Sequence, residues 1–243
     1  MTNFKFNRTI QAAILAMITL CIIYLSVQSM RANSWYFSAR NTVQHMASDP
    51  ADYSRLSDAE RAIALATELE PSHPHYWQLR AHINMLNINA FKDSAEATQA
   101  NNMQIYKEAE QALLKSVELR QSWAETWIAL AQVVSYQEGA SERVYEYIQQ
   151  AKSVGPNKLS VHLGIIQLAL INWPNLPPKF KALYVAELNL AVKHGYHFFE
   201  VFNLAKQVNR LPTLCLSLQF GNAFEDVRAA HLYKIHCNTN SNK

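Results

Sequence analysis

Apolar residues recur every three or four positions along most of this 243-residue chain, which is the spacing of one face of an α-helix. From Ser57 onward, for example, Ala59, Ala62, Ile63 and Ala66 fall on one face. The prolines and all but one of the five glycines lie between such runs, where helices are expected to begin or end. The pattern therefore predicts an all-α fold.

The N-terminal segment differs from the rest, because Ile10–Val27 carries no charged residue and no amphipathic pattern. At 1.5 Å per residue this run reaches about 27 Å, close to the hydrocarbon thickness of a bilayer. A cleaved signal peptide is one alternative, but Val27-Gln28-Ser29 is a poor exit site. A buried core helix is another, but such a helix needs an amphipathic face. We predict a single uncleaved transmembrane anchor at residues 10–30, with residues 10–27 in the membrane.

The charges that flank the apolar run set the expected orientation. Lys5 and Arg8 precede the run, and Arg31 and Arg40 follow it, so the bias is slight. A short basic tail ahead of a long domain usually stays in the cytoplasm. We therefore expect a cytoplasmic tail, a juxtamembrane helix and linker, and a periplasmic C-terminal domain on an inner-membrane anchor. The cytoplasmic tail comprises residues 1–9, and the juxtamembrane helix and linker comprise residues 31–56.

The periodic part of the chain contains a repeat. Glu60–Pro71 leads into Trp77, with Ala81 four residues later, and Glu110–Arg120 leads in the same way into Trp127 and Ala131. A weaker third copy has Gly164 at the position of the alanine. The fifty residues between the two tryptophans are about one 34-residue period plus a polar insertion at residues 87–102.

Repeated helices of this kind stack into a solenoid, and we expect about four helix pairs within residues 57–210. The first pair starts at Ser57 and Pro74. The other three are Tyr106–Arg120 with Trp123–Tyr136, Ser141–Val154 with Leu159–Ile171, and Phe180–Lys193 with Tyr196–Arg210.

The C-terminal part, residues 211–243, does not follow the repeat. Leu214, Leu216, Leu218 and Phe220 alternate with other residues, which favours an extended, docked segment. We expect a last helix at Phe224–Cys237 to cap the open end of the stack, and a disordered tail to follow it.

The helix pairs predicted within about Ser57–Arg210 resemble tetratricopeptide repeats. Trp127 with Ala131 is similar to the family's Trp-x2-Leu-Gly start, and the prolines that end the repeats are typical of the family. In that family the first helix of each pair lines a concave face that binds other proteins. The resemblance thus implies a partner-binding groove, which would contain His75, Gln78, His82, Glu125, Gln132, Tyr136 and Lys158.

Composition and motifs give no indication of nucleic-acid binding, catalysis, or a cofactor or metal site. The net charge is only +3, and no basic stripe with interleaved aromatic residues occurs, so we expect no nucleic-acid partner. No glycine-rich phosphate loop and no Gly-x-Ser-x-Gly sequence is present. His73-x-His75 and His194-x-x-His197 have ligand-like spacing, but neither pair has a cysteine or acidic residue at ligand spacing. We expect no catalytic, cofactor or metal site.

Cys215 and Cys237 flank the predicted last helix. In an extracytoplasmic domain they could form a disulfide that ties the cap to the preceding segment. Two buried free thiols are an equally acceptable reading of the sequence.

The whole layout resembles the VpsP-type proteins of bacterial exopolysaccharide gene clusters. The shared features are a short basic N-terminus, one anchor, degenerate helical repeats and a late Leu-Pro-Thr-Leu-Cys segment, Leu211–Cys215. The resemblance implies a non-catalytic role in biofilm-matrix polysaccharide assembly or export, with membrane or periplasmic proteins of that complex as partners. One alternative is a general assembly factor for envelope proteins. Another is a carbohydrate-modifying enzyme with Glu125 or Glu200 as the acid, although no second carboxylate is paired with either.

Overall fold

The computed structural model describes residues 2–48, 53–90 and 99–237, and every regular element in them is helical. No strand occurs in these ranges, which confirms the predicted all-α class. The helices form two compact units, Met1–Leu119 and Arg120–Lys243. The predicted disordered tail at residues 238–243 lies outside the described residues.

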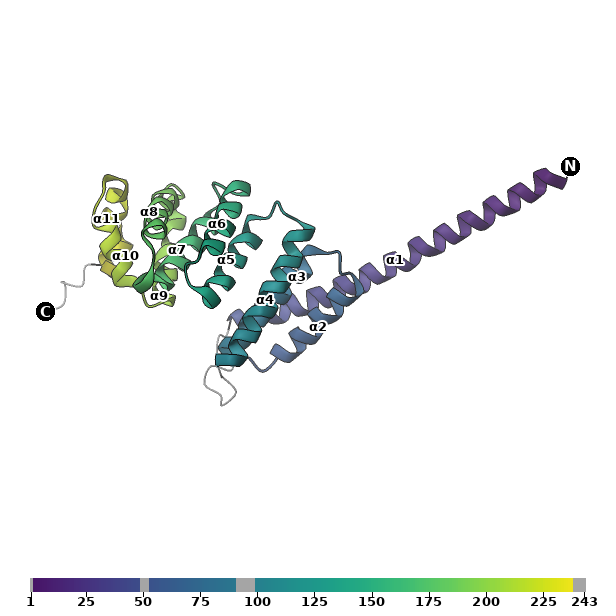
Figure 1. Cartoon of the computed structure of the whole chain (residues 1–243), viewed down its shortest axis with the longest axis horizontal. Coiled ribbons are helices and arrows are strands. Elements are labelled where there is room, and N and C mark those ends of the chain that lie inside the picture. Colours follow the sequence, from purple (N-terminus) through teal and green to yellow (C-terminus); the bar gives the residue numbers. More distant parts are fainter. Residues whose placement is uncertain (1, 49–52, 91–98, 238–243) are drawn as a thin grey trace. The chain divides into compact units, whose positions relative to one another are not determined.

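In its described residues, 2–48, 53–90 and 99–119, the first unit contains four helices, which are labelled in Figure 1. They are α1 (Thr2–Ser48), α2 (Leu56–Leu69), α3 (Pro74–Ala90) and α4 (Gln99–Leu119). α1 packs against α2, α3 packs against α4, and α2 also contacts α3. The polar insertion predicted at residues 87–102 is partly helical, because α3 continues to Ala90 and α4 begins at Gln99.

α1 has two halves with different surroundings. Its apolar N-terminal half projects beyond the other helices of the unit in Figure 1, and none of this apolar stretch is buried. Within the described residues it is the one helix that is long and apolar enough to cross a membrane. The C-terminal half buries Ala32, Ala39, Val43 and Met46 in a core formed mainly with α2 and with Tyr76 and Ile83 of α3.

The helix pairs are therefore offset by one helix from the predicted pairs. The sequence pattern begins the first pair at Ser57, but α2 packs most extensively against the C-terminal half of α1. Residues assigned to a juxtamembrane helix and linker thus supply the first helix of a repeat. The reason is physical: the small and apolar residues of α2 need a partner face, and α1 provides a complementary one.

The second unit continues the series with eight α-helices in its described residues. They are α5 (Ala124–Glu138), α6 (Glu142–Val154), α7 (Leu159–Ile171), α8 (Pro178–Val192), α9 (Phe199–Gln207), α10 (Leu211–Leu218), α11 (Glu225–Ala229) and α12 (His231–Cys237). Short 3₁₀ turns lie at Trp173–Asn175, Gly195–Phe198 and Asn222–Phe224. α5 pairs with α6 and α7 pairs with α8, while α7 also contacts α5 and α9.

The two repeat tryptophans make the same contact. The indole Nε1 of Trp77 donates to the carbonyl oxygen of Pro71 at 2.7 Å, and that of Trp127 donates to the carbonyl oxygen of Gln121 at 2.8 Å. In both cases the acceptor lies six residues upstream, in the turn before the Trp-bearing helix. The sequence repeat therefore corresponds to a repeated local structure.

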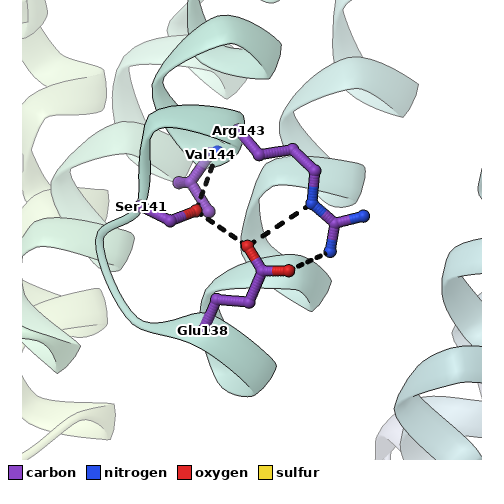
Figure 2. Close-up of polar contacts among 4 residues, drawn as sticks. All are labelled: Glu138, Ser141, Arg143 and Val144. Atoms are coloured by element: carbon purple, nitrogen blue, oxygen red, sulfur yellow. Dashed lines mark hydrogen bonds and ion pairs between the residues drawn. The ribbon is translucent and has the colours of Figure 1, made fainter.

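The turn between α5 and α6 shows how one pair is closed (Figure 2). Gly139 ends α5 with a positive φ of 69°, a conformation that favours glycine. Ser141 caps α6, because its hydroxyl accepts from the backbone N–H of Val144 and donates to Glu138. Arg143 also donates to Glu138, so the end of α5 and the start of α6 are joined through one carboxylate.

The prediction of an extended segment after Leu211 is wrong. Residues Leu211–Leu218 form α10, with Leu214 and Leu218 fully buried and Leu216 exposed. A lone strand would leave its backbone polar groups without partners, whereas a helix satisfies them internally. Pro212 fits because its missing N–H falls in the first turn of the helix.

The predicted last helix is divided at Ala230, whose extended backbone separates α11 from α12. A disulfide joins Cys215 of α10 to Cys237 of α12, with the Cα atoms 5.3 Å apart. The C-terminal segment is thus linked covalently to α10.

Candidate functional site

A row of polar side chains crosses from α5 to α7. At one end, the Lys158 ammonium group, just before α7, lies 2.9 and 3.0 Å from the two carboxylate oxygens of Glu125 on α5. The hydroxyl of Ser160 donates to the same carboxylate at 3.3 Å. Burial raises the pKa of Glu125, but the contacts with Lys158 and Ser160 and a backbone hydrogen bond together outweigh it, so its pKa lies below the usual range.

Two turns further along α5, Gln132 makes the second contact of this row. Its side-chain amide donates to the side-chain oxygen of Gln167 at 2.9 Å and to the backbone oxygen of Gly164 at 3.3 Å. We call the surface formed by Glu125, Gln132, Lys158, Ser160 and Gln167 the α5–α7 face. Its side chains are exposed or half-buried, so solvent reaches all of them.

Gly164 allows the two helices to approach closely at this face. A Cβ atom on Gly164 would lie 2.4 Å from Cγ1 of Ile128, which is itself buried. This contact explains why the third repeat has glycine where the first two have Ala81 and Ala131. The geometry of the α5–α7 face therefore depends on Gly164, the residue that the sequence repeat aligns with Ala81 and Ala131.

The other predicted groove residues are distributed over two helices. Tyr136 lies four residues beyond Gln132, near the end of α5, and is 39% exposed. His75, Gln78 and His82 lie on α3, at a spacing that puts them on one side of that helix. In the second unit the structure thus brings Glu125 and Lys158 into contact, with Gln132 two turns further along α5, while the three α3 residues belong to the first unit.

A buried charged cluster was missed by the sequence analysis. Glu187 of α8 is fully buried, and its carboxylate lies 2.6 Å from Nζ of Lys152 on α6 and 2.5 Å from Nδ1 of His162 on α7. Burial raises the pKa of Glu187, but its hydrogen bonds and charge interactions with His162 and Lys152 outweigh this and lower the pKa overall.

The Glu187 cluster ties three consecutive helices together. His162 is 2% exposed, so neither His162 nor Glu187 is accessible to a substrate from solvent. Lys152 and His162 lie 35 and 25 residues before Glu187 in the sequence. No motif could have revealed the cluster, because only the packing of α6, α7 and α8 creates it.

Two of the histidines with ligand-like spacing, His73 and His197, contact neighbouring side chains. The ring of His73 stacks on Tyr76, with the centroids 4.2 Å apart, and His197 lies 3.3 Å from Glu200 on the protein surface. Among the residues described, no group of three or more His, Cys, Asp or Glu side chains is placed to hold a metal ion.

Comparison with known proteins gives fold-level likeness alone. No protein-family model matches the chain, and no curated protein matches it in sequence. One similar solved structure is YrrB, a TPR protein with an unusual peptide-binding site, at 12% identity and a TM-score of 0.42. That match covers 81% of this chain and 96% of YrrB.

Another similar structure is PilF of Pseudomonas aeruginosa, at 15% identity and a TM-score of 0.30. It covers 83% of this chain and 98% of PilF. Both scores are low, so the assignment of a repeat fold rests on the helix pairs and the repeated tryptophan contacts described above.

Proposed function

We propose that this protein is a membrane-anchored, non-catalytic scaffold whose α5–α7 face binds a segment of another protein. The observation that carries the proposal is the hydrogen-bonded pair Gln132–Gln167, which holds two partly exposed amides in place between neighbouring repeats. Side-chain amides can donate to and accept from the backbone of an extended chain. Fixing them beforehand lowers the entropy cost of binding.

The charged end of the α5–α7 face would determine the direction in which a partner segment binds. Glu125 and Lys158 present one carboxylate and one ammonium group side by side, each close to half exposed. A bound segment with its own charges would be oriented by this pair, because complementary charge contributes more to register than to affinity.

The anchor in this proposal is the apolar half of α1. Its unburied apolar surface is unfavourable in water and suits a lipid environment. The flanking charges favour a cytoplasmic N-terminus and a periplasmic repeat region. The Cys215–Cys237 disulfide supports this side of the membrane, since such bonds persist in oxidising compartments.

The finer assignment is an accessory role in bacterial exopolysaccharide synthesis or export. It rests on the resemblance to VpsP-type proteins, and the partners would be membrane or periplasmic components of a polysaccharide assembly complex. A tethered scaffold raises the local concentration of its partner in the same membrane. A general envelope assembly factor has the same anchor and the same face but a different partner.

An enzymatic role for Glu125 is disfavoured by its surroundings. A general acid must be protonated near neutral pH, whereas Lys158 and Ser160 help to keep Glu125 ionised. Glu200 is on the surface beside His197, and the contacts described for it include no second carboxylate.

Photo-crosslinking in cells tests the face and identifies the partner. A benzoylphenylalanine at Tyr136, next to the α5–α7 face, is compared with one at Tyr196, an 84% exposed tyrosine that does not belong to the face. We expect a discrete adduct with a membrane or periplasmic protein from position 136 and none from 196. Polysaccharide synthesis or export proteins in the adduct would support the finer role, and other envelope proteins would support the assembly factor. Equal labelling from both positions, or none from 136, would contradict the proposed face.

A further inference from the structure

We propose that the turn between α2 and α3 lies in the phospholipid headgroup layer, so that the first repeat rests on the membrane surface. The turn comprises residues 70–73, and we call it the α2–α3 turn. This inference rests on the anchor of the proposed function. It adds a second contact between the protein and the bilayer.

The α2–α3 turn is attached to α1 at the level where the apolar run ends. The hydroxyl of Ser29 donates to the carboxylate of Glu70 at 3.1 Å. The buried hydroxyl of Tyr76 lies 2.9 Å from the side-chain oxygen of Asn33 and 3.3 Å from the same carboxylate. These bonds link two turns of α1 to the end of α2 and the start of α3.

An open hollow of about 480 Å³ lies between α1 and the turn. It is lined on the α1 side by Leu25, Ser26, Gln28 and Ser29, and on the other side by Leu69–Ser72. Leu25 and Ser26 belong to the predicted membrane segment itself. The turn thus stands beside the last residues of that segment, with no intervening linker.

The length of α1 places this level relative to the bilayer. Ile10–Val27 reaches about 27 Å along the helix, against roughly 30 Å of hydrocarbon. The hydrocarbon edge therefore falls near Val27 and Gln28, and headgroups occupy the next several ångströms. Ser29 and Asn33 lie in that layer, and the α2–α3 turn is hydrogen-bonded to them or to their partners.

Side chains on the flank of α1 mark the same boundary. Arg31 donates to Gln28 at 3.2 Å, and Gln28 donates to the hydroxyl of Tyr24 at 2.9 Å. Tyrosine and arginine with apolar bodies and polar ends prefer the interface between lipid and water. The boundary inferred from these residues agrees with the one inferred from helix length.

α1 is one continuous helix through this region, so the position of the turn follows from that of the anchor. The repeat cannot stand away from the membrane unless α1 breaks between Val27 and Ala32 or the bonds to Glu70 are lost. The end of α4 lies on the same side, because Ser116 donates to the backbone oxygen of Pro74 beside the turn.

Depth-dependent fluorescence quenching tests the placement of the turn. The full chain with Cys21→Ala is reconstituted in phosphatidylcholine vesicles, with the Cys215–Cys237 disulfide kept oxidised. A single bimane label is placed at Ser72→Cys, in the turn, or at Ser57→Cys, an exposed serine at the opposite end of α2. Vesicles with a nitroxide on the lipid headgroup serve as quencher.

We expect the label at position 72 to lose most of its fluorescence, while the label at position 57, about 18 Å further along α2, keeps its intensity. Equal intensities at the two positions, both at the level found without quencher, would overturn the inference. A label on the native Cys21, with nitroxide on the acyl chains, separates the two claims. If Cys21 is not quenched, the anchor itself is wrong; if Cys21 is quenched and position 72 is not, only the surface contact is wrong.

Discussion

The carboxylate of Glu187 and Nδ1 of His162 lie 2.5 Å apart in a part of the protein where both side chains are almost completely buried. Nζ of Lys152 lies 2.6 Å from the other carboxylate oxygen of Glu187, and the Lys152 side chain is 29% exposed to solvent. A buried carboxylate is unfavourable without such partners, and removing one partner of a buried pair is strongly destabilising. The cluster therefore makes the packing of α6, α7 and α8 dependent on three specific side chains.

The substitution Glu187→Gln should destabilise this part of the second unit by about 3 kcal/mol, because Lys152 and His162 lose their charged partner. Hydrogen–deuterium exchange of α7 and α8 in the detergent-solubilised full chain measures the loss locally. Glu146→Gln, on the exposed side of α6, is the matched control and should change exchange little. Equal protection in the two variants would contradict a stabilising role for the cluster.

The same cluster should make stability depend on pH. The pKa of Glu187 is lowered in the folded protein, so its stabilising contribution is present above the unfolded pKa of about 4.3. That contribution is lost as the pH falls through the lower, folded-state pKa. The difference in α7 and α8 protection between the natural chain and Glu187→Gln should therefore shrink in acid. A difference that stays constant down to the acid-unfolding transition would argue against the ionised carboxylate.

Gly164→Ala should destabilise the contact between α5 and α7. The new Cβ would meet Ile128 at 2.4 Å, and overpacking of this kind costs about 1–3 kcal/mol. Alanine gains up to about 1 kcal/mol in helix propensity, which offsets only part of the loss. Thermal unfolding followed by circular dichroism should show a lower midpoint. In the double variant with Ile128→Ala the clash disappears, so the two effects should be clearly non-additive.

Reduction of the Cys215–Cys237 bond should loosen the C-terminal helices. The bond closes a loop with a sequence separation of 22, for which chain entropy predicts about 3 kcal/mol. Amides of α10 and α12 should exchange faster in dithiothreitol, while those of α5 and α6 should not change. Cys237→Ser should reproduce the effect without reductant, and Cys21→Ser serves as the control because Cys21 is not in the bond. Unchanged α10 and α12 exchange in both cases would show that the bond does not hold this end.

Charge exchange separates folding from recognition at the α5–α7 face. Glu125→Lys places two cations side by side next to Lys158 and should abolish the crosslink from position 136. The double variant Glu125→Lys with Lys158→Glu restores a local pair with reversed direction. If a partner binds the charged groups of positions 125 and 158 in a fixed orientation, crosslinking should stay weak in the double variant although folding is normal by circular dichroism. Full recovery would mean that the pair acts only within the protein.

The sequence predicted the class of fold because helical periodicity and the positions of proline and glycine are local properties. The Trp77 and Trp127 repeat was recognisable for the same reason, and each tryptophan makes the same contact six residues upstream. Leu211–Leu218 was misread because apolar residues at every second position in so short a run fit a helix as well as a strand. The placement of Leu214 and Leu218, four residues apart, decided between them only once α10 packed.

Of the candidate site, the sequence supplied the residue types and their helix faces. It could name Glu125, Gln132 and Lys158 because each lies at a regular position within its own repeat. It could not supply Gln167 as the partner of Gln132, or Ile128 as the side chain that a Cβ atom on Gly164 would meet. Those relations join residues 35 and 36 positions apart, and only the packed helices bring them within reach.

The sequence by itself determined that this chain is helical, repetitive and provided with one long apolar segment, because each property is written in neighbouring residues. Only the tertiary structure decided that α1 serves as both the apolar segment and the first helix of the repeats, and that Glu187 has Lys152 and His162 as partners. The physical reason is that burial and pairing depend on which faces meet. Local periodicity specifies a face but not the surface that covers it.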